Sequence, residues 1–150
     1  MLALDSVPAA GGLVIDQSEK ILFIFKDGRW DLPKGLIDRN GKAHHVAIRE
    51  VAEETGLPLA KLRSISELVP TAHISKFGKR RALKTIRWFL IQYLGERDPF
   101  EPQIQEGVEH CEWIPIWDLE RPLGNCPSRI RYLVSFWLKA RQHIKADGEK

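Results

Sequence analysis

The first third of the chain alternates short apolar runs with polar turns. Residues 9–15 (AAGGLVI) and 21–26 (ILFIFK) are rich in β-branched or aromatic side chains and flank the polar segment 16–19 (DQSE). This pattern predicts two strands joined by a turn. Residues 26–35 (KDGRWDLPKG) combine glycine, proline and aspartate, so we expect a loop that leads into the next element.

Three further apolar segments follow in the rest of the chain. Residues 62–69 (LRSISELV) alternate as a strand does, and residues 85–94 (TIRWFLIQYL) form a long apolar run, joined to them through a basic segment around Gly78. Residues 111–116 (CEWIPI) predict one more strand, and Pro115 places it at a sheet edge or marks its end. A sheet of several strands is therefore expected.

Two segments carry helical periodicity. The first spans about residues 43–55, and Gly56 follows where a helix commonly ends in the left-handed conformation. The second begins near Pro127, a residue suited to a first helical turn, and continues beyond residue 138. The apolar positions that define the two helices are Ala47, Ile48, Val51 and Ala52, then Ile130, Leu133, Val134, Trp137 and Leu138. Strands around one central helix, with a second helix near the end, predict an α+β or layered α/β/α fold with a mixed sheet.

Length and composition fit one compact domain. The chain has 150 residues, 43% hydrophobic and 29% charged, and we expect a single domain over residues 1–150 with a core at about residues 8–143. No apolar run approaches the roughly 20 residues of a membrane span, and no secretory signal is recognisable. Cys111 and Cys126 lack the spacing of a zinc site. We therefore expect a cytoplasmic protein without a membrane partner.

The positive charge of the chain is concentrated in one short segment. The formal net charge is only +3, but six cations fall within twelve residues: Lys76, Lys79, Arg80, Arg81, Lys84 and Arg87. Such a cluster indicates local anion binding. The alternative is the solvated surface of a hairpin, which is the default unless another part of the chain implies an acidic substrate.

Three glutamates gather on the first predicted helix. At 100° per residue, Glu50, Glu53 and Glu54 fall within about a third of the helix circumference. Like charges so close destabilise a helix unless a positive group compensates them, and Mg²⁺ prefers carboxylate oxygens together with water and substrate phosphate. Arg49 can reach Glu53 one turn further on. The alternative is a solvated acidic helix face.

The spacing of these residues decides between the two interpretations. The pattern G35-x5-G41-x7-R49-E50-V51-x-E53-E54-x-G56-L57 closely resembles the signature of the MutT-like Nudix hydrolase family, with Gly41 where the family has its first glutamate. The resemblance covers most of residues 8–140. It implies an α/β/α sandwich with a mixed β-sheet. It also implies an enzyme that cleaves a pyrophosphate bond in a nucleoside diphosphate linked to another moiety, with Mg²⁺ or Mn²⁺.

The resemblance also implies roles for individual residues. Glu53 and Glu54 would bind the metal, and Glu50 would be a further ligand or the group that orients or deprotonates the attacking water. The backbone carbonyl of Lys34 is another expected metal ligand, whereas Arg49 would orient a carboxylate. Family members often use one more carboxylate from a loop after the long strand, and the candidates are Glu106 and, behind it, Glu101 and Glu109.

Gly41 is the departure from the family pattern. The missing glutamate commonly pairs with the arginine of the motif, and Asp38 could replace it as the partner of Arg49. A rearranged turn is the alternative, because Asn40 and Gly41 both accept left-handed backbone angles. We favour an active enzyme over a catalytically weakened domain that binds a nucleotide without cleaving it.

The basic segment then suggests the substrate. Lys34, together with Lys76, Lys79, Arg81 and Lys84, would bind phosphates. These cations favour a phosphate-rich small molecule, such as a dinucleoside polyphosphate or a diphosphoinositol polyphosphate. The 5′ end of an RNA is the alternative and the one expected route to a nucleic acid. The sequence leaves the oligomeric state undetermined.

Overall fold

The computed structural model describes the backbone of residues 4–148 and the side chains of residues 4–143. The strands are β1 (Asp5–Ile15), β2 (Lys20–Lys26), β3 (Arg29–Asp31), β4 (Lys34–Leu36), β5 (Leu62–Glu67), β6 (Thr71–Phe77), β7 (Arg80–Tyr93) and β8 (Val108–Pro115). The α-helices are α1 (Ala43–Thr55), α2 (Glu120–Leu123) and α3 (Ser128–Gly148), and the short 3₁₀ turns are η1 (Leu59–Lys61), η2 (Ile104–Glu106) and η3 (Ile116–Asp118).

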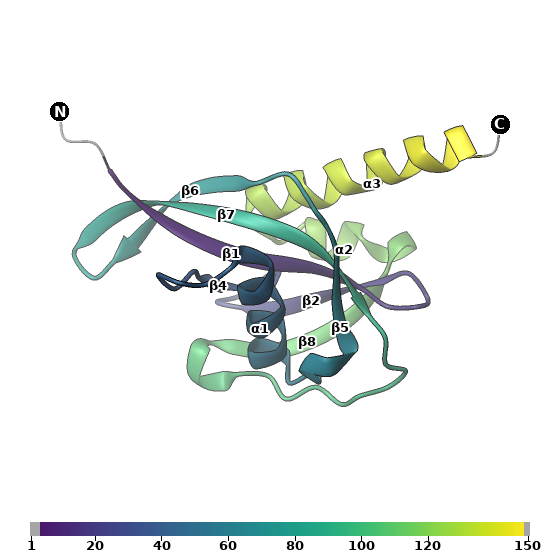
Figure 1. The fold of residues 1–150 in the computed structure, drawn as a ribbon, viewed down its shortest axis with the longest axis horizontal. Helices are drawn as coiled ribbons and strands as arrows, with labels where there is room; N and C mark the ends of the chain where they lie inside the picture. Colours follow the sequence, from purple (N-terminus) through teal and green to yellow (C-terminus); the bar gives the residue numbers. More distant parts are fainter. Residues whose placement is uncertain (1–3, 149–150) are drawn as a thin grey trace.

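All the described strands belong to one mixed sheet (Figure 1). The main path runs β3-β2-β1-β7-β5, while β4 pairs with β1, β6 with β7 and β8 with β2. The pairing of β1 with β7 is parallel along the whole of β1, from Asp5 opposite Ala82 to Ile15 opposite Gln92, and the other pairings are antiparallel. The long strand β7 is therefore central to the sheet, because it pairs with β1, β5 and β6.

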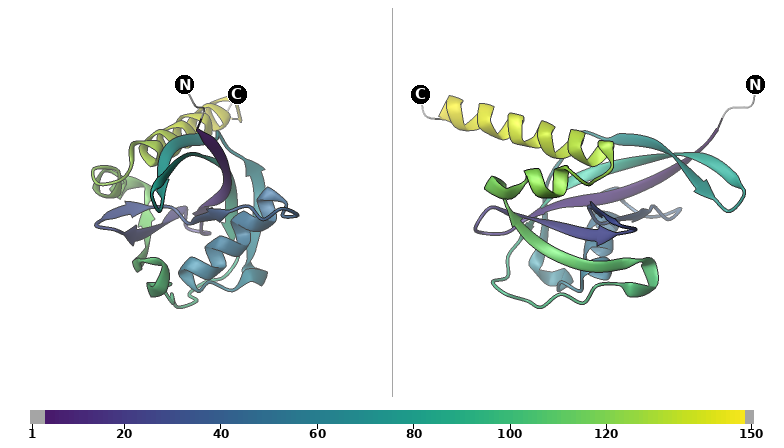
Figure 2. Two further views of the ribbon diagram at one scale, coloured as in Figure 1. Left: turned by 90° about the vertical axis from the view of Figure 1, so that its left-hand side faces the viewer. Right: turned by 180° about the vertical axis from the view of Figure 1, so that it is seen from behind.

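A helix covers each face of this sheet, as Figure 2 shows. Because successive side chains of a strand point to opposite faces, each strand supplies two hydrophobic cores. From β1, Ala10 and Val14 pack in one core with Val51 of α1, whereas Leu13 packs in the other with Leu133 of α3. The α/β/α sandwich with a mixed sheet is therefore confirmed.

Gly11 lets the short strand β4 lie against β1 next to α1. A Cβ atom at Gly11 would lie 2.6 Å from the carbonyl oxygen of Pro33 and 2.5 Å from the Trp88 ring. The backbone N–H of Gly12 donates to that same carbonyl at 3.1 Å, and Gly35 pairs with Ala10. This close approach places Lys34 and Gly35 beside the glutamate-bearing face of α1.

The helix predicted for residues 43–55 is confirmed, and Gly56 follows it at a φ of 79°. The expected loop at residues 26–35 is wrong in part, because β3 and the start of β4 form there through pairing with β2 and β1. The connection expected between residues 69 and 85 contains a separate strand, β6, which pairs with β7. Pro115 ends β8, as expected.

Among the described helices, none is long and apolar enough to cross a membrane.

Candidate active site

Glu50 lies directly over Gly35. A Cβ atom at Gly35 would fall 2.1 Å from the Glu50 carboxyl carbon and 2.4 Å from each of its oxygens, which is far inside any contact distance. The glycine therefore provides the space that the carboxylate occupies. Glu50 is only 16% exposed, and burial, followed by the charge of Glu53, raises the pKa of its carboxyl.

Arg49 lies between three acidic side chains of the site and forms ion pairs with them. Its guanidinium lies 3.2 Å from Asp38, 3.7 Å from Glu50 and 3.7 Å from Glu53. The expected pair between Asp38 and Arg49 is thus confirmed. One arginine can in this way hold the orientation of two glutamates while an aspartate from the preceding loop holds the arginine.

The turn at Gly41 has an ordinary backbone. The left-handed angles considered for Asn40 and Gly41 are wrong, because neither residue has a positive φ. Instead the backbone N–H of Gly41 donates to the carbonyl of Asp38 at 2.9 Å. This tight turn brings Asp38 back toward Arg49.

Glu54 is the buried member of the cluster. It is 4% exposed, and its Oε2 atom has no hydrogen-bond donor. Burial raises the pKa of its carboxyl to about 7, against the opposing charges of Lys26 and Lys34. A buried carboxylate oxygen without a donor fits a divalent cation, which would supply the missing positive charge.

Glu50, Glu53 and Glu54 line a cleft of about 280 Å³. Its lining combines carboxylates, lysines and amide or apolar groups: Glu50, Glu53, Glu54, Glu106, Lys26, Lys34, Lys84, Gly35, Leu36 and Gln103. Glu106 reaches it from η2, whereas Glu101 and Glu109 do not line it. Within the described residues no three His, Cys, Asp or Glu side chains converge tightly enough to form a complete metal cage. Mg²⁺ usually keeps several waters and substrate phosphate oxygens among its ligands.

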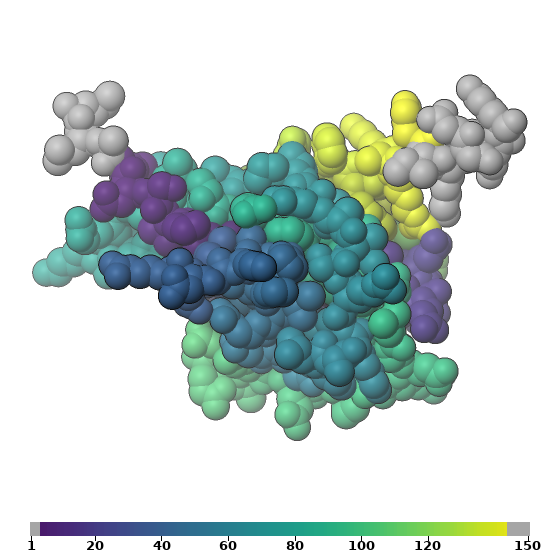
Figure 3. All heavy atoms as spheres, in the orientation of Figure 1, coloured from purple at the N-terminus to yellow at the C-terminus, as the bar shows by residue number. Residues whose placement is uncertain are grey.

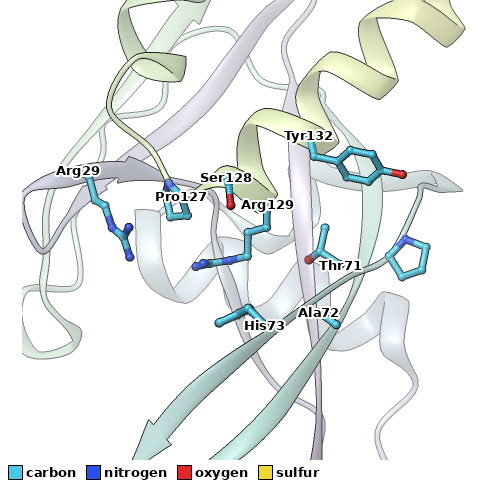
Figure 4. A pocket seen from close by; sticks show the side chains of 9 residues that line it. Arg29, Thr71, Ala72, His73, Pro127, Ser128, Arg129 and Tyr132 are labelled. Atoms are coloured by element: carbon cyan, nitrogen blue, oxygen red, sulfur yellow. The ribbon is translucent and has the colours of Figure 1, made fainter.

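A second and larger hollow, of about 560 Å³, lies where β6 meets the start of α3 (Figure 4). Its lining is Arg29, Pro70, Thr71, Ala72, His73, Pro127, Ser128, Arg129 and Tyr132. Arg129 reaches from α3 toward His73 on β6, and the buried Nε atom of Arg129 and Nδ1 atom of His73 have no partners. Burial, followed by the charge of Arg129, lowers the pKa of His73 to about 4, so this imidazole is neutral near pH 7.

Asp31 contacts one residue of the cleft and one residue of the larger hollow. It is 7% exposed and lies 3.3 Å from Arg129, which lines the larger hollow, and 3.3 Å from Lys34, which lines the cleft. Lys84 is affected by the same positive charges, because burial and then the charge of Lys34 lower the pKa of its ammonium. A basic boundary therefore runs between the cleft and the larger hollow.

The register of the β6–β7 hairpin separates its side chains into two faces. His73 pairs with Lys84, and Phe77 with Arg80, so these residues share one face, here called the Phe77 face. The Lys84 ammonium lies 5.9 Å from the centre of the Phe77 ring, in agreement with this register. This face is continuous with both hollows.

The opposite face of the hairpin, here called the Lys76 face, carries Lys76 paired with Arg81 and Ile74 paired with Leu83. Lys79 lies in the turn between the strands. Of the cations expected to bind phosphate, Lys34 and Lys84 line the cleft, whereas Lys76, Lys79 and Arg81 line neither hollow. A substrate role for these three residues stays a prediction.

Comparison with known families accounts for this arrangement. Residues 5–134 match the model of the family described as the NUDIX domain, and this range extends from β1 into α3. The chain belongs to the NUDIX domain family. The resemblance seen in the spacing of Gly35, Arg49 and the glutamates is thereby confirmed, and this NUDIX match includes the cleft, the larger hollow and the hairpin.

Relatives of this NUDIX chain are known in several organisms. MutT4 of Mycobacterium tuberculosis is 34% identical over 137 residues, covering 83% of this chain and 49% of that protein. An RNA pyrophosphohydrolase of Cereibacter sphaeroides is 29% identical over 92 residues, covering 56% and 54%. The chain thus spans about half the length of these relatives. A solved Ap4A hydrolase of C. elegans shares the fold, with a TM-score of 0.62, 19% identity and coverage of 89% of this chain and 98% of that one.

The larger hollow is the part of the NUDIX structure that the sequence did not reveal. Its polar residues Arg29, His73 and Arg129 come from three elements and lie up to 100 positions apart. The sequence feature that could have indicated this hollow is a second set of cations near Pro127, but these residues lie outside the motif. The carboxylates, in contrast, follow one another on a single helix.

Proposed function

We propose that this NUDIX domain is a metal-dependent pyrophosphohydrolase that acts on a phosphate-rich nucleotide. The observation that carries the proposal is the cleft, in which Glu50, Glu53, Glu54 and Glu106 face Lys34 and Lys84. Carboxylates bind the metal and lysines bind phosphates, so the cleft combines the two parts that phosphoryl transfer requires.

Each group in the cleft has a part in the reaction. Glu53, Glu54 and Glu106, with the backbone carbonyl of Lys34, would hold Mg²⁺ or Mn²⁺, which when bound neutralises diphosphate oxygens and lowers the pKa of a coordinated water. Glu50 orients the attacking water and accepts its proton, a task suited to a carboxyl whose pKa is raised by burial.

Arg49 acts through the carboxylates. Its contacts with Glu50 and Glu53, fixed by Asp38, keep both side chains aimed at the cleft. In this proposal Gly41 stands where the family has a glutamate, and activity persists because Asp38 holds the arginine instead. A domain that binds a nucleotide without cleaving it is the alternative outcome.

The larger hollow gives the substrate its second binding site. About 560 Å³ lies within the usual range for a small-molecule pocket, and Tyr132 offers a ring that is half exposed. A nucleoside bound there would send its phosphates across the basic boundary at Lys34 toward the glutamates. The proposed substrates are therefore dinucleoside polyphosphates. Diphosphoinositol polyphosphates, which have no nucleoside, are the alternative that the lysines of the cleft would also bind.

RNA is the second candidate substrate. The exposed cations Lys79 and Arg80 at the hairpin tip extend the positive surface beyond the cleft, and a relative is named RNA pyrophosphohydrolase. An RNA that carries a 5′ triphosphate would present the same phosphates to the same cleft. The partners proposed are thus a small nucleotide or an RNA 5′ end.

The experiment that tests this function is phosphate release from a panel of substrates. The panel contains nucleoside triphosphates, Ap4A, ADP-ribose, a diphosphoinositol polyphosphate and 5′-triphosphorylated RNA, each with Mg²⁺, Mn²⁺ or EDTA. Turnover that needs the metal identifies the substrate class. Nucleotide binding without turnover in any metal would contradict the hydrolase and support the alternative.

A further inference from the structure

We propose that the Phe77 face of the β6–β7 hairpin binds the single-stranded RNA that continues from a nucleotide held at the cleft. The inference rests on the proposed function and names its substrate as the 5′ region of an RNA rather than an isolated nucleotide. The residues that carry it are Phe77 and Arg80, with Lys79 in the turn between them.

The hairpin starts at the site and leads away from it. The first residues of β6, Thr71 to His73, line the larger hollow, and Lys84 of β7 lines the cleft. From His73 the strand continues for four residues to Phe77, roughly 13 Å at the usual rise of a strand. Figures 1 and 3 show that the hairpin, in teal, projects beyond the rest of the molecule. A chain leaving the site along this face therefore reaches Phe77 after a short distance.

The tip offers a ring and a cation side by side. Gly78, at a φ of 63°, allows the tight turn that sets Phe77 opposite Arg80. Phe77 is 37% exposed although it is a large apolar residue at the end of a strand. The Arg80 side chain is 84% exposed, and its ion pair with Asp5, at 3.5 Å between two exposed groups, contributes little stability. Both side chains can therefore bind a ligand.

This chemistry fits a single strand of nucleic acid. Proteins bind single strands by stacking bases on aromatic rings and by tracking the phosphates with cations. A duplex hides the faces of its bases, so it offers Phe77 nothing on which to stack. Because this face of the hairpin begins at the cleft, it also sets the direction of the bound RNA. The 5′ phosphates lie at the glutamates, and the following nucleotides lie along the hairpin.

The two faces of the hairpin supply matched controls. Arg80 and Arg81 are adjacent and carry the same charge, but they point to opposite faces, and Ile74 on the Lys76 face is exposed as Phe77 is. Long-range attraction to RNA would fall equally in Arg80→Gln and Arg81→Gln. A direct contact would be lost only in Arg80→Gln.

The test measures the affinity of the full chain for labelled RNA that carries a non-hydrolysable 5′-triphosphate analogue, by fluorescence anisotropy in Mg²⁺ at several salt concentrations. The probes are a dinucleotide and an oligonucleotide of about ten nucleotides, a length within known single-strand sites. We expect Phe77→Ala to weaken binding of the longer RNA at least about fivefold, as the loss of one stacked base does. Arg80→Gln should also lower the salt slope by about 0.7, the value for one phosphate contact. Ile74→Ala and Arg81→Gln should change either quantity far less.

Two results would overturn the inference. One is equal affinity for the dinucleotide, the longer RNA and its duplex, and the other is an equal loss in Arg80→Gln and Arg81→Gln. Hydrolysis of RNAs of the same sequences with a natural 5′ triphosphate, by the unaltered chain in Mg²⁺, separates this inference from the proposed function. Length-dependent binding without hydrolysis contradicts the function alone, and hydrolysis without dependence on length contradicts the inference alone.

Discussion

A methyl group added at Gly35 would strike the Glu50 carboxylate. The new Cβ atom would lie 2.1 Å from the carboxyl carbon, and carbon atoms in contact need about 3.5 Å, so the carboxylate must move by about 1.4 Å. A misplacement of about 1 Å in an active site can cost about a hundredfold in rate, or roughly 2.7 kcal/mol of transition-state stabilisation. We therefore expect kcat/KM of Gly35→Ala to fall about a hundredfold.

The assay is steady-state hydrolysis of the best substrate in Mg²⁺, with thermal unfolding to verify the fold. Gly41→Ala is the matched control, because its Cβ would meet Val46 at 3.0 Å and require a shift of only a few tenths of an ångström. We expect this control to stay within about twofold of the unaltered chain in kcat/KM, which is less than 0.5 kcal/mol. Wild-type kcat/KM in Gly35→Ala would refute the placement of Glu50 at the reacting groups.

Three further predictions concern pH, the larger hollow and Gly41. Because the folded pKa of Glu54, about 7, lies above its unfolded value of 4.5, its protonated form stabilises the metal-free fold below pH 4.5. That stability, of the order of 3 kcal/mol, is lost as the pH rises through 7. Unfolding in EDTA at pH 8 should therefore show Glu54→Gln to be more stable than the unaltered chain, and an equal or lower melting temperature would contradict the burial argument. Arg129→Met should raise KM for nucleotides about tenfold or more while kcat changes little, since a charged hydrogen bond contributes about 1.5–3 kcal/mol. An unchanged KM in steady-state assays would place the nucleoside elsewhere. Gly41→Glu should change kcat/KM by at most about fivefold, the value of an exposed ion pair, because Arg49 already has Asp38 as a partner. A much larger gain would mean that Gly41 limits catalysis.

The sequence predicted the glutamate-bearing helix α1 because its determinants are local. Apolar residues at helical spacing define α1, and Gly56 ends it in the left-handed conformation. The same spacing fixes which glutamates share one side of the helix. The pair between Asp38 and Arg49 was also foreseeable, since the two residues lie eleven positions apart around a short turn.

The parts that depend on distant pairing could not be predicted. The strands β3 and β4 have three residues each and exist because β2 and β1 bind them. The larger hollow needs β6 and α3 to meet, and no local pattern gives that contact. The division of the hairpin cations into two faces follows from the register at Gly78, which places Arg80 and Arg81 on opposite sides.

The central claim is that the glutamates form a metal site for hydrolysis, and Glu53→Gln tests it most directly. Glu53 is half exposed, so the change should leave the fold intact. Glu109→Gln is the control, because Glu109 is exposed and lies outside the cleft. The measurement is Mg²⁺-dependent phosphate release together with Mn²⁺ affinity by calorimetry. We predict that Glu53→Gln weakens Mn²⁺ binding and lowers hydrolysis at least about a hundredfold, since a metal supplies several kcal/mol of transition-state stabilisation. Metal affinity and turnover equal to those of Glu109→Gln would contradict the account.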